Sequence, residues 1–173
     1  MSEYPNEPVS DLPTPPCEFT DDEGRQIELR QASDDVEALV EMYLDFDPED
    51  RAQGIPPTKE ADIREWLAVV TSDEGLNVIA WHGNSAVGHV MLVADQEDGY
   101  ELAIFVLQAY QGASIGTELL RTALGGAAES GVERVWLSVE RWNRPAISLY
   151  RKIGFETSGD DHFEKMMKLR LDR

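Results

Sequence analysis

Apolar side chains recur every three or four residues in two segments of the N-terminal half of the chain. The first segment carries Val36, Leu39, Val40 and Tyr43, and the second carries Ile63, Trp66, Leu67 and Val70. This spacing places each set on one face of an α-helix, which has about 3.6 residues per turn. Ser33 and Thr58 precede the two segments and are residue types that cap helix N-termini. The pattern therefore predicts two amphipathic helices that begin just after these residues.

The middle of the chain consists of β-rich runs separated by short turns. The runs "LNVIAWH", "SAVGHVMLV" and "YELAIFVLQAY" occupy residues 76–82, 85–93 and 100–110. The first turn is "GN", a two-residue hairpin signal, and the second is "ADQEDG". Strands joined by turns this short lie antiparallel, so these runs predict a three-stranded meander.

The C-terminal half alternates helix and strand. The segment "SIGTELLRTALGGAAES" predicts a helix that ends near Gly131, and "NRPAISLYRKI" predicts another with Pro145 in its tolerated first turn. Between them "VERVWLSVE" predicts a strand, and "GFETSG" with "HFEKMMKLRL" predicts a closing strand pair. A helical crossover links the strands near 100–107 and 134–140, so we expect them to be parallel and adjacent.

With a first strand in "RQIELRQAS", the elements follow the order β-α-α-β-β-β-α-β-α-β-β. This order predicts an α/β (α+β) fold with a mixed, mostly antiparallel central sheet of about six to seven strands. Five of the nine prolines fall in the first sixteen residues. Because such a segment buries little and lacks backbone donors, we expect residues 1–24 to be a flexible tail or an edge attachment, and residues 25–173 to form the domain.

The charge balance restricts the partners. Fifteen basic and 34 acidic residues give a formal charge of −19, which repels nucleic acid and anionic membranes. The acidity is typical of a solvated surface, with adaptation to high salt or recognition of a basic partner as alternatives. Cys17 is the single cysteine, and the first residues lack the basic and apolar segments of a signal peptide. We therefore expect a cytoplasmic protein.

The stretch "GASIG", residues 112–116, fits opposing interpretations. It matches G-x-S-x-G, which presents a nucleophilic serine in α/β-hydrolases, but a glycine-bearing turn before a helix also offers backbone N–H groups to phosphate. A Ser114 nucleophile needs a histidine base, and two of the three histidines, His82 and His89, lie in the meander while the third is His162. A meander is also the wrong topology for a hydrolase sheet. The pattern favours an anion-binding turn, with a purely structural turn as the alternative.

Two longer segments resemble one family. "IFVLQAYQGASIGTELLRTAL" resembles the coenzyme-A-binding motif Q/R-x-x-G-x-G/A of the GCN5-related N-acetyltransferases, and "VERWNRPAISLYRKIGFE" resembles their later N-x-x-A-x-x-L-Y-x-x-x-G-F segment. Gln111 and Gly116 take the first and last positions of the first motif. Ser114 stands where glycine is usual, at little cost if its φ is negative. The resemblance covers roughly residues 25–170 in element order.

This resemblance implies an acetyl-coenzyme-A-dependent enzyme that transfers the acetyl group directly to an amine of a small molecule or to a protein α-amine. The implied coenzyme-binding residues are Phe105, Val106, Leu107, Gln111, Gly112, Ala113, Ser114, Ile115, Gly116, Asn143 and Tyr150. Backbone groups of the first three should hold the pantetheine arm, with the N–H near Val106 on the thioester carbonyl. The amides opening the helix at Ile115 should hold the diphosphate, with Arg121 as a helper or simply a solvated residue.

Catalytic roles follow from the same resemblance. Tyr150 matches the general acid of the family, although a half-buried structural aromatic is the alternative. Glu101 is the candidate base that takes the proton of the amine, and an exposed strand glutamate is the alternative. Asn143 matches a coenzyme-contacting asparagine, and an N-cap role would explain it equally well.

Further expectations concern partners. The histidines are isolated and no H-E-x-x-H or C-x-x-C occurs, so we expect no metal. Acceptor specificity should reside in irregular segments such as the loop at 47–58, and a homodimer is possible. A non-catalytic module that senses acyl-coenzyme A is the alternative function.

Overall fold

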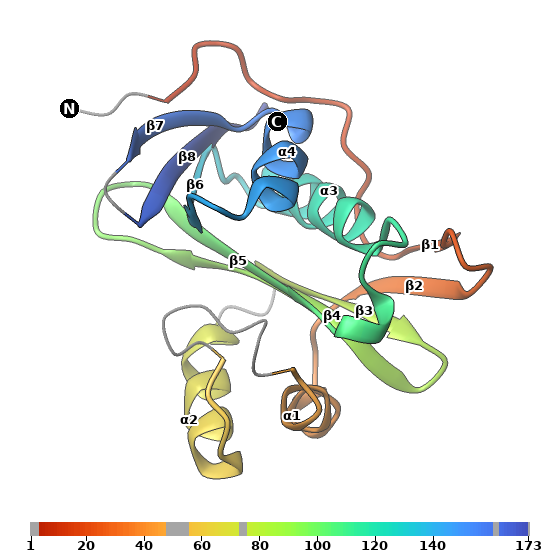
Figure 1. The fold of residues 1–173 in the computed structure, drawn as a ribbon. Helices are drawn as coiled ribbons and strands as arrows, with labels where there is room; N and C mark the ends of the chain where they lie inside the picture. The colour runs from red at the N-terminus through yellow and green to blue at the C-terminus, as the bar shows by residue number, and fades with distance from the viewer. Residues whose placement is uncertain (1–3, 48–55, 73–75, 161–162, 173) are drawn as a thin grey trace.

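The computed structural model describes residues 4–47, 56–72, 76–160 and 163–172. Over these residues the chain forms one sheet of eight strands in the order β1-β2-β3-β4-β5-β6-β8-β7, with helices on both faces (Figure 1). Neighbouring strands pair antiparallel except for β5 and β6, which are parallel. The predicted mixed, mostly antiparallel sheet is thus confirmed. Its strand count is higher than predicted because the proline-rich N-terminal segment supplies β1.

The element bounds agree with the predicted order apart from this extra strand. The strands are β1 (Cys17–Thr20), β2 (Gln26–Gln31), β3 (Asn77–His82), β4 (Ser85–Ala94), β5 (Tyr100–Val106), β6 (Arg134–Glu140), β7 (Glu156–Asp160) and β8 (Glu164–Arg170). The helices are α1 (Val36–Leu44), α2 (Glu60–Val70), α3 (Ile115–Glu129) and α4 (Arg144–Ile153), with a 3-10 turn η3 (Gln108–Tyr110) after β5.

The first two helices begin later than predicted. The N-cap positions are taken by Asp35 and Lys59, so the predictions for Ser33 and Thr58 are wrong. The backbone N–H of Ser33 instead donates to the Asp35 carboxylate at 2.8 Å, which forms a turn before α1. Val36 also lies off the buried face, with 36% of its surface exposed.

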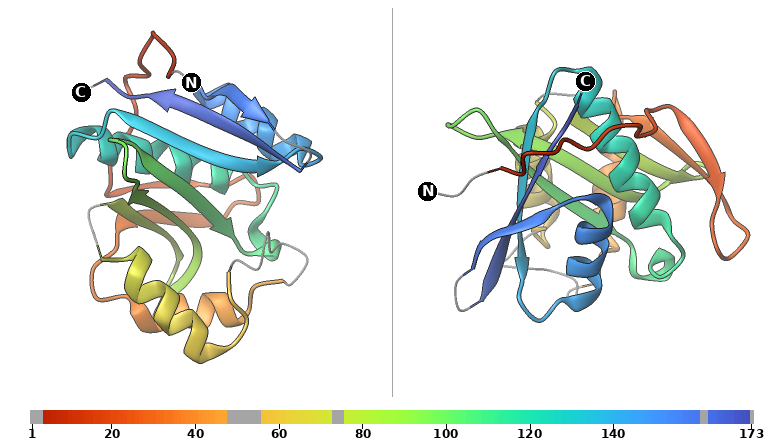
Figure 2. Two further views of the ribbon diagram at one scale, coloured as in Figure 1. Left: turned by 90° about the vertical axis from the view of Figure 1, so that its left-hand side faces the viewer. Right: turned by 90° about the horizontal axis from the view of Figure 1, so that it is seen from above.

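The helices divide the core into two layers. Helices α1 and α2 lie against one face of β3–β5, and α3 and α4 lie on the opposite face (Figures 1 and 2). The α3 layer buries apolar residues such as Leu119 and Val135, and the α1–α2 layer buries others such as Leu39 and Ile63. At the C-terminus of α3, Gly131 adopts φ 93° while the N–H of Val132 reaches the carbonyl of Ala127 at 3.0 Å, which confirms the predicted left-handed cap.

The N-terminal segment runs along α3 and joins the sheet at its edge (Figure 1). Val9 forms two hydrogen bonds with the end of β8. Its N–H donates to the Arg170 carbonyl at 2.7 Å, and its carbonyl accepts from the Asp172 N–H at 3.0 Å. Farther on, Cys17 pairs opposite Leu29 in the β1–β2 ladder. These residues form an edge attachment, which was one of the two alternatives for this segment. Whether residues 25–173 fold without it stays a prediction.

A buried polar chain ties α1 to the sheet. The Tyr43 hydroxyl lies 2.7 Å from His89 Nδ1, and His89 Nε2 lies 2.8 Å from Asn77 Oδ1. The Asn77 amide in turn donates to the Val70 carbonyl at 3.0 Å. Since an amide oxygen only accepts, His89 carries its proton on Nε2 and accepts from Tyr43 on Nδ1. Burial lowers the pKa of His89 to about 3, so the imidazole is neutral in the folded protein.

Gly125→Ala tests the contact between α3 and the N-terminal segment. A glycine-to-alanine change inside a helix ordinarily stabilises a protein by roughly 1 kcal/mol. Here a Cβ at Gly125 would overlap the Pro13 carbonyl, so we expect the melting temperature to fall. In a chain that starts at residue 17 the same change should raise it. An equal rise in both chains, measured by thermal unfolding, would show that residues 12–15 do not rest on α3.

His89 should make stability depend on pH. Below pH 6.5, the ordinary pKa of histidine, His89 binds a proton in the unfolded chain. In the folded chain it stays neutral until about pH 3. The free energy of unfolding should therefore fall as the pH drops through this window, by at most about 1.4 kcal/mol per pH unit from this group. Urea titrations of the protein and of His89→Gln isolate the effect, because the carboxylates titrate in both. Parallel pH profiles for the two proteins would contradict the assignment.

Candidate functional site

Strands β5 and β6 begin as a parallel pair and then separate. Their pairing covers Tyr100 opposite Val135 and Glu101 opposite Trp136. Beyond Glu101, β5 continues to Val106 and β6 to Glu140 without further paired positions. The second half of β5 therefore keeps β4 as its partner on one side only.

The alternation of hydrogen bonds along β5 decides which of its groups face the gap. The Leu107 N–H donates to the Val87 carbonyl at 2.9 Å, and Phe105 stands opposite His89 in the same ladder. In an antiparallel pair, alternate residues bond to the partner while those between direct their N–H and C=O away. Ile104 and Val106 therefore present their main-chain groups to the β6 side.

This alternation corrects one expectation. The main-chain groups of Phe105 and Leu107 face β4 and not the gap. The Leu107 N–H donates to β4, and the Leu107 carbonyl accepts from the Tyr110 N–H at 2.8 Å. Of the three residues expected to line the gap, only Val106 presents its backbone there, and its neighbour two positions back, Ile104, was missed. Alternation along a strand is visible in a sequence, but which set bonds to β4 depends on the pairing register.

Side chains hold the end of β5 in place. The Gln111 amide donates to the Val106 carbonyl at 3.0 Å, so the first residue of the glycine-bearing motif closes the loop onto the strand. On the opposite face, the Phe105 ring lies 5.7–5.8 Å from the rings of Tyr43, Phe46 and Trp66. Aromatic pairs at this distance in edge-to-face geometry are favourable. The C-terminal end of β5 is thus held in place after the strand has separated from β6.

The turn after β5 has the geometry of an anion site. Gly112 and Ser114 both have φ 74°, on either side of Ala113, and α3 begins at Ile115. Left-handed residues next to a helix N-terminus turn successive N–H groups toward one point, and the first amides of α3 have no intrahelical acceptor. A Cβ built on Gly112 would meet no atom within 4 Å. The space beside Gly112 is therefore free of other protein atoms.

Ser114 adopts an energetically unfavourable backbone conformation in this turn. Serine was expected to cost little here only if its φ were negative, but the φ of Ser114 is positive. The left-handed conformation costs about 1 kcal/mol for a residue with a Cβ. Its hydroxyl donates to the Asp22 carboxylate at 2.6 Å. His82 and His89 bond instead to Tyr110 and Tyr43, and His162 lies outside the described residues. Within the described chain Ser114 has no histidine base, so the geometry does not support a hydrolase.

A second loop supports the turn, and no sequence pattern indicated this contact. Between β1 and β2, the Asp22 N–H donates to the Ala113 carbonyl at 3.1 Å. The Arg25 guanidinium donates to the Ala109 carbonyl at 3.2 Å and stacks 4.2 Å above the Tyr110 ring. These contacts join residues more than 80 positions apart. The only local signal is "DDEGR", which predicts a turn but not its partner.

Asp21 makes this supporting loop rigid. Its buried carboxylate accepts from the Arg25 backbone at 2.8 Å and from the Arg25 side chain at 2.7 Å. Burial alone would raise the pKa of this carboxyl, but the hydrogen bonds from Arg25 and from the Glu23 backbone lower it below its ordinary value. The ionised carboxylate therefore orients Arg25 toward Tyr110.

Helix α4 brings the predicted acid to the same side as α3. Tyr150 is 9% exposed, belongs to the apolar cluster that Val106 packs against, and has its ring 5.8 Å from that of Phe155. Burial raises the pKa of Tyr150 to about 12, so the phenol keeps its proton at neutral pH. A Cβ on Gly116 would lie 3.9 Å from the Leu149 side chain, so the residue before Tyr150 borders the start of α3.

Asn143 and Arg121 have structural partners. The Asn143 side chain accepts from the Ala146 N–H at 3.3 Å, which is the N-cap alternative. A contact of Asn143 with a coenzyme stays a prediction. Arg121 forms an ion pair with Glu118 at 3.5 Å, and both side chains are partly exposed.

Glu101 lies at the opposite end of β5 from the glycine-bearing turn. It shares the α1–α2 face of the sheet with Ala103 and Phe105, because side chains alternate along a strand. Partial burial raises the pKa of Glu101, and the nearby carboxylates of Glu164 and Asp95 raise it further. A carboxylate with a raised pKa is a better proton acceptor than an ordinary glutamate.

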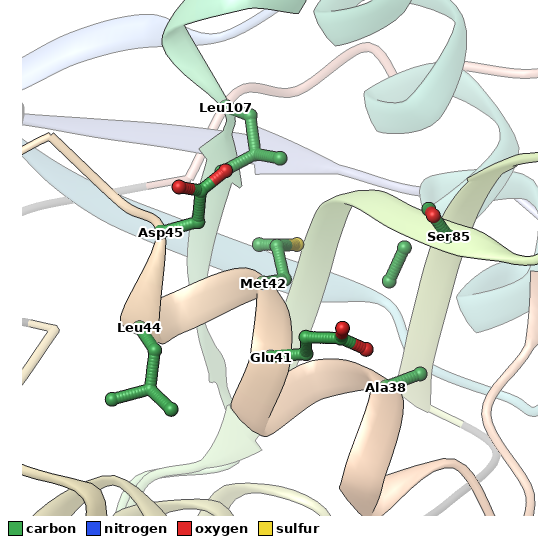
Figure 3. A pocket seen from close by; sticks show the side chains of 8 residues that line it. Ala38, Glu41, Met42, Leu44, Asp45, Ser85 and Leu107 are labelled. Carbon is green, nitrogen blue, oxygen red and sulfur yellow. The ribbon is translucent and has the colours of Figure 1, made fainter.

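A pocket of about 400 Å³ borders the end of β5 on the α1 side (Figure 3). It runs from Leu107 along α1 to Ser85, and Glu41 and Asp45 give it an acidic lining. The loop expected to shape the acceptor site, residues 47–58, leaves α1 next to this pocket, but residues 48–55 lie outside the described chain. In the described residues no group of three or more metal-ligating side chains occurs, and no helix there is long and apolar enough to cross a membrane.

Known proteins resemble this chain in sequence. An uncharacterized N-acetyltransferase of Mycobacterium bovis is 34% identical over 85 residues, which cover 49% of this chain and 54% of that protein. Streptothricin acetyltransferase of Streptomyces lavendulae is 34% identical over 126 residues, 71% of this chain and 60% of that protein. The chain spans little more than half the length of these relatives.

A solved structure has the same fold. The PaiA N-acetyltransferase of Thermoplasma acidophilum, in complex with coenzyme A, superimposes with a TM-score of 0.65 at 21% identity, over 83% of this chain and 98% of that one. The family model described as "Acetyltransferase (GNAT) family" matches residues 36–155. These residues span α1 to α4 and include both the gap beside β5 and the turn at the start of α3. On this match the chain belongs to the acetyltransferase (GNAT) family.

Proposed function

We propose that this protein transfers the acetyl group of acetyl-coenzyme A directly to an amine. The observation that carries the proposal is the separation of β5 from β6 beside an open turn at a helix N-terminus. Such a gap offers main-chain partners to an extended ligand, and such a turn offers amides to a phosphate. The presence of coenzyme A in the similar Thermoplasma acidophilum structure supports the same ligand here.

The carrier is bound mainly by main-chain groups. The diphosphate accepts from the amides of the turn at Gly112–Gly116 and gains from the dipole of α3. The pantetheine arm lies along β5 and pairs with the gap-facing groups of Ile104 and Val106. In a chain with a formal charge of −19, neutral amides hold an anion without requiring a basic surface.

Acetyl transfer then follows a balanced sequence of bond changes. The amine nitrogen attacks the thioester carbon, and a gap-facing N–H of β5, that of Val106, donates to the oxyanion that forms. The carbon–sulfur bond breaks, and Tyr150 donates its phenolic hydrogen to the departing thiolate. The amine gives up one proton, and the products are the amide and the free thiol.

Glu101 receives the proton of the amine. It stands five residues before Val106 on β5, a separation of about 17 Å along a strand. A carboxylate at that distance receives the proton through a chain of water molecules. The raised pKa of Glu101 suits this role.

The acceptor is a small-molecule amine or a protein α-amine. The excess of carboxylates in the sequence supports activity in a salt-rich cytoplasm, where screening reduces the repulsion between these charges.

The sheet has two edge strands, β1 and β7, and pairing at such an edge would support a homodimer.

Gly112→Asp tests the anion-binding turn. Aspartate tolerates a positive φ better than most residues, and the Cβ has free space around it. The added carboxylate should repel the diphosphate and weaken coenzyme A binding by about tenfold or more, measured by calorimetry. Gly112→Asn is the matched control, with nearly the same shape and no charge. Equal affinities of the two variants would remove the diphosphate from this turn.

Tyr150→Phe separates a catalyst from a sensor. The change removes one hydroxyl from a buried ring, so coenzyme A binding and thermal stability should stay close to those of the parent. Turnover should drop by about 10²-fold, because general-acid assistance has that size. The assay follows free thiol released from acetyl-coenzyme A in the presence of a panel of amines and peptides, at low and at multimolar salt. Binding of coenzyme A without thiol release for any acceptor in the unmodified protein would favour the sensor.

A further inference from the structure

The open face of β6 and β8 carries a larger pocket that the proposed chemistry does not use. Helices α1 and α2 lie under β3–β5, and no helix stands in front of β6 and β8 on this face (Figure 2, left). The pocket, of about 1020 Å³, is lined by residues of both strands, by the β4–β5 turn and by Tyr4 and Asn6 of the N-terminal segment. It is thus built from three parts of the chain that only the fold brings together.

The pocket is a basic region in an acidic protein. Arg134, Lys168 and Arg170 line it together with the two carboxylates of Asp95 and Glu97. The chain as a whole has 15 basic and 34 acidic residues, so the balance of charge is reversed here. Three of the 15 basic residues line this pocket with two acidic ones, whereas a random distribution of charged residues would give an acidic majority.

The sheet register places these cations on one face. Arg134 stands opposite Arg170, and Trp136 stands opposite Lys168, on adjacent antiparallel strands. Like charges directly opposite each other destabilise a sheet, and a local arrangement that lowers stability often marks a functional site. An anion between the two arginines would relieve the repulsion.

The cations are held by contacts within the pocket. The ring of Tyr4 lies 4.6 Å from Lys168 Nζ and 5.7 Å from the Arg134 guanidinium carbon, and Arg170 donates to the Asn6 carbonyl at 3.1 Å. Cation–π contacts of this length position a positive charge without neutralising it.

Asp95 has its own partners in the fold. Its carboxylate accepts from the backbones of Glu97 at 2.7 Å and Gly99 at 2.9 Å, and from the Trp136 indole at 2.7 Å. Burial alone would raise its pKa, but these bonds and the nearby Lys168 keep it below its ordinary value. The ionised carboxylate thus closes the β4–β5 turn and fixes Trp136 as one wall of the pocket.

The pocket lies on the same face of the sheet as the proposed base Glu101. Glu101 pairs with Trp136, which pairs with Lys168, so Glu101 and the pocket share one face of the sheet. Val106, whose N–H faces the reacting carbonyl, is five residues farther along β5 than Glu101, which places Lys168 about 17 Å and Arg134 about 23 Å below the level of that carbonyl. An extended chain of about five to seven residues spans this distance.

We propose that the acceptor carries an anionic group on a spacer of about 17–23 Å from its amine, and that Arg134, Lys168 and Arg170 bind this group. A peptide with a free α-amine and acidic side chains at its sixth and seventh positions has this form. The inference rests on the proposed acetyl transfer for the position of the amine. The binding of an acidic peptide to the pocket does not depend on turnover.

The test compares peptides that differ only in charge. The peptides Ala-Ala-Ala-Ala-Ala-Glu-Glu, Ala-Ala-Ala-Ala-Ala-Gln-Gln and Ala-Ala-Ala-Ala-Ala-Arg-Arg, each amidated at the C-terminus, are assayed for thiol release from acetyl-coenzyme A at one ionic strength. We expect kcat/KM to be about tenfold higher for the acidic peptide than for the neutral one, as a close charge pair typically provides. Free glutamate, whose carboxylates lie close to its amine, should gain nothing.

A charge reversal in the pocket makes the test specific. Arg134→Glu should lower kcat/KM for the acidic peptide by about tenfold and raise it for the arginine peptide, with the neutral peptide unchanged. Arg151→Glu makes the same change of charge on α4, on the other face of the sheet, and should alter none of the three. Equal rates for the three peptides, or an equal shift of all three in Arg134→Glu, would overturn the inference.

Calorimetry separates failure of the pocket from failure of the chemistry. If no amine releases thiol, the proposed acetyl transfer is wrong. The pocket inference then stands if the acidic peptide binds the unmodified protein and binds Arg134→Glu at least about tenfold more weakly, and it falls if the two affinities are equal.

Discussion

The structure depends on one feature of its sheet, the loss of pairing between β5 and β6 after two positions. A strand inside a sheet normally has partners on both sides, because an unpaired buried backbone group costs free energy. Ile104 and Val106 direct their main-chain groups toward the strand that has moved away. The fold therefore contains a vacant strand position, and an extended ligand that fills it restores the hydrogen bonds that the sheet lacks.

The elements around this gap are arranged to keep it open. The Phe105 ring is packed among the aromatic rings of α1 and α2, and the Gln111 side chain bonds to the carbonyl of Val106. The turn that follows is fastened from outside by the loop between β1 and β2. In that loop Asp22 accepts from the Ser114 hydroxyl, and Arg25 covers Tyr110. The N-terminal segment thus helps to support the turn that we propose as the anion site.

Charge is distributed differently on the two sides of the reaction path. The turn proposed to hold the carrier offers neutral amides, while acidic residues line the pocket beside α1 and basic residues line the pocket on the open face of β6 and β8. In a protein of formal charge −19, a basic pocket next to the gap has a clear electrostatic contrast with its surroundings. Such contrast favours ligands with separated charges over uniformly cationic ones.

The sequence by itself determined the element order, the parallel pair of strands, the start of α3 at Ile115 and the family, because these depend on local periodicity, turn residues and two motifs within short stretches of chain. Tertiary structure decided the rest. The pairing register made Ile104 and Val106, and not Phe105 and Leu107, the residues whose backbones face the gap. Contacts between distant segments produced the support of the turn by Asp22 and Arg25, the attachment of the N-terminal segment and the basic pocket. Local patterns carry no information about such contacts, because hydrogen bonds and packing between residues 80 or more positions apart exist only once the chain has folded.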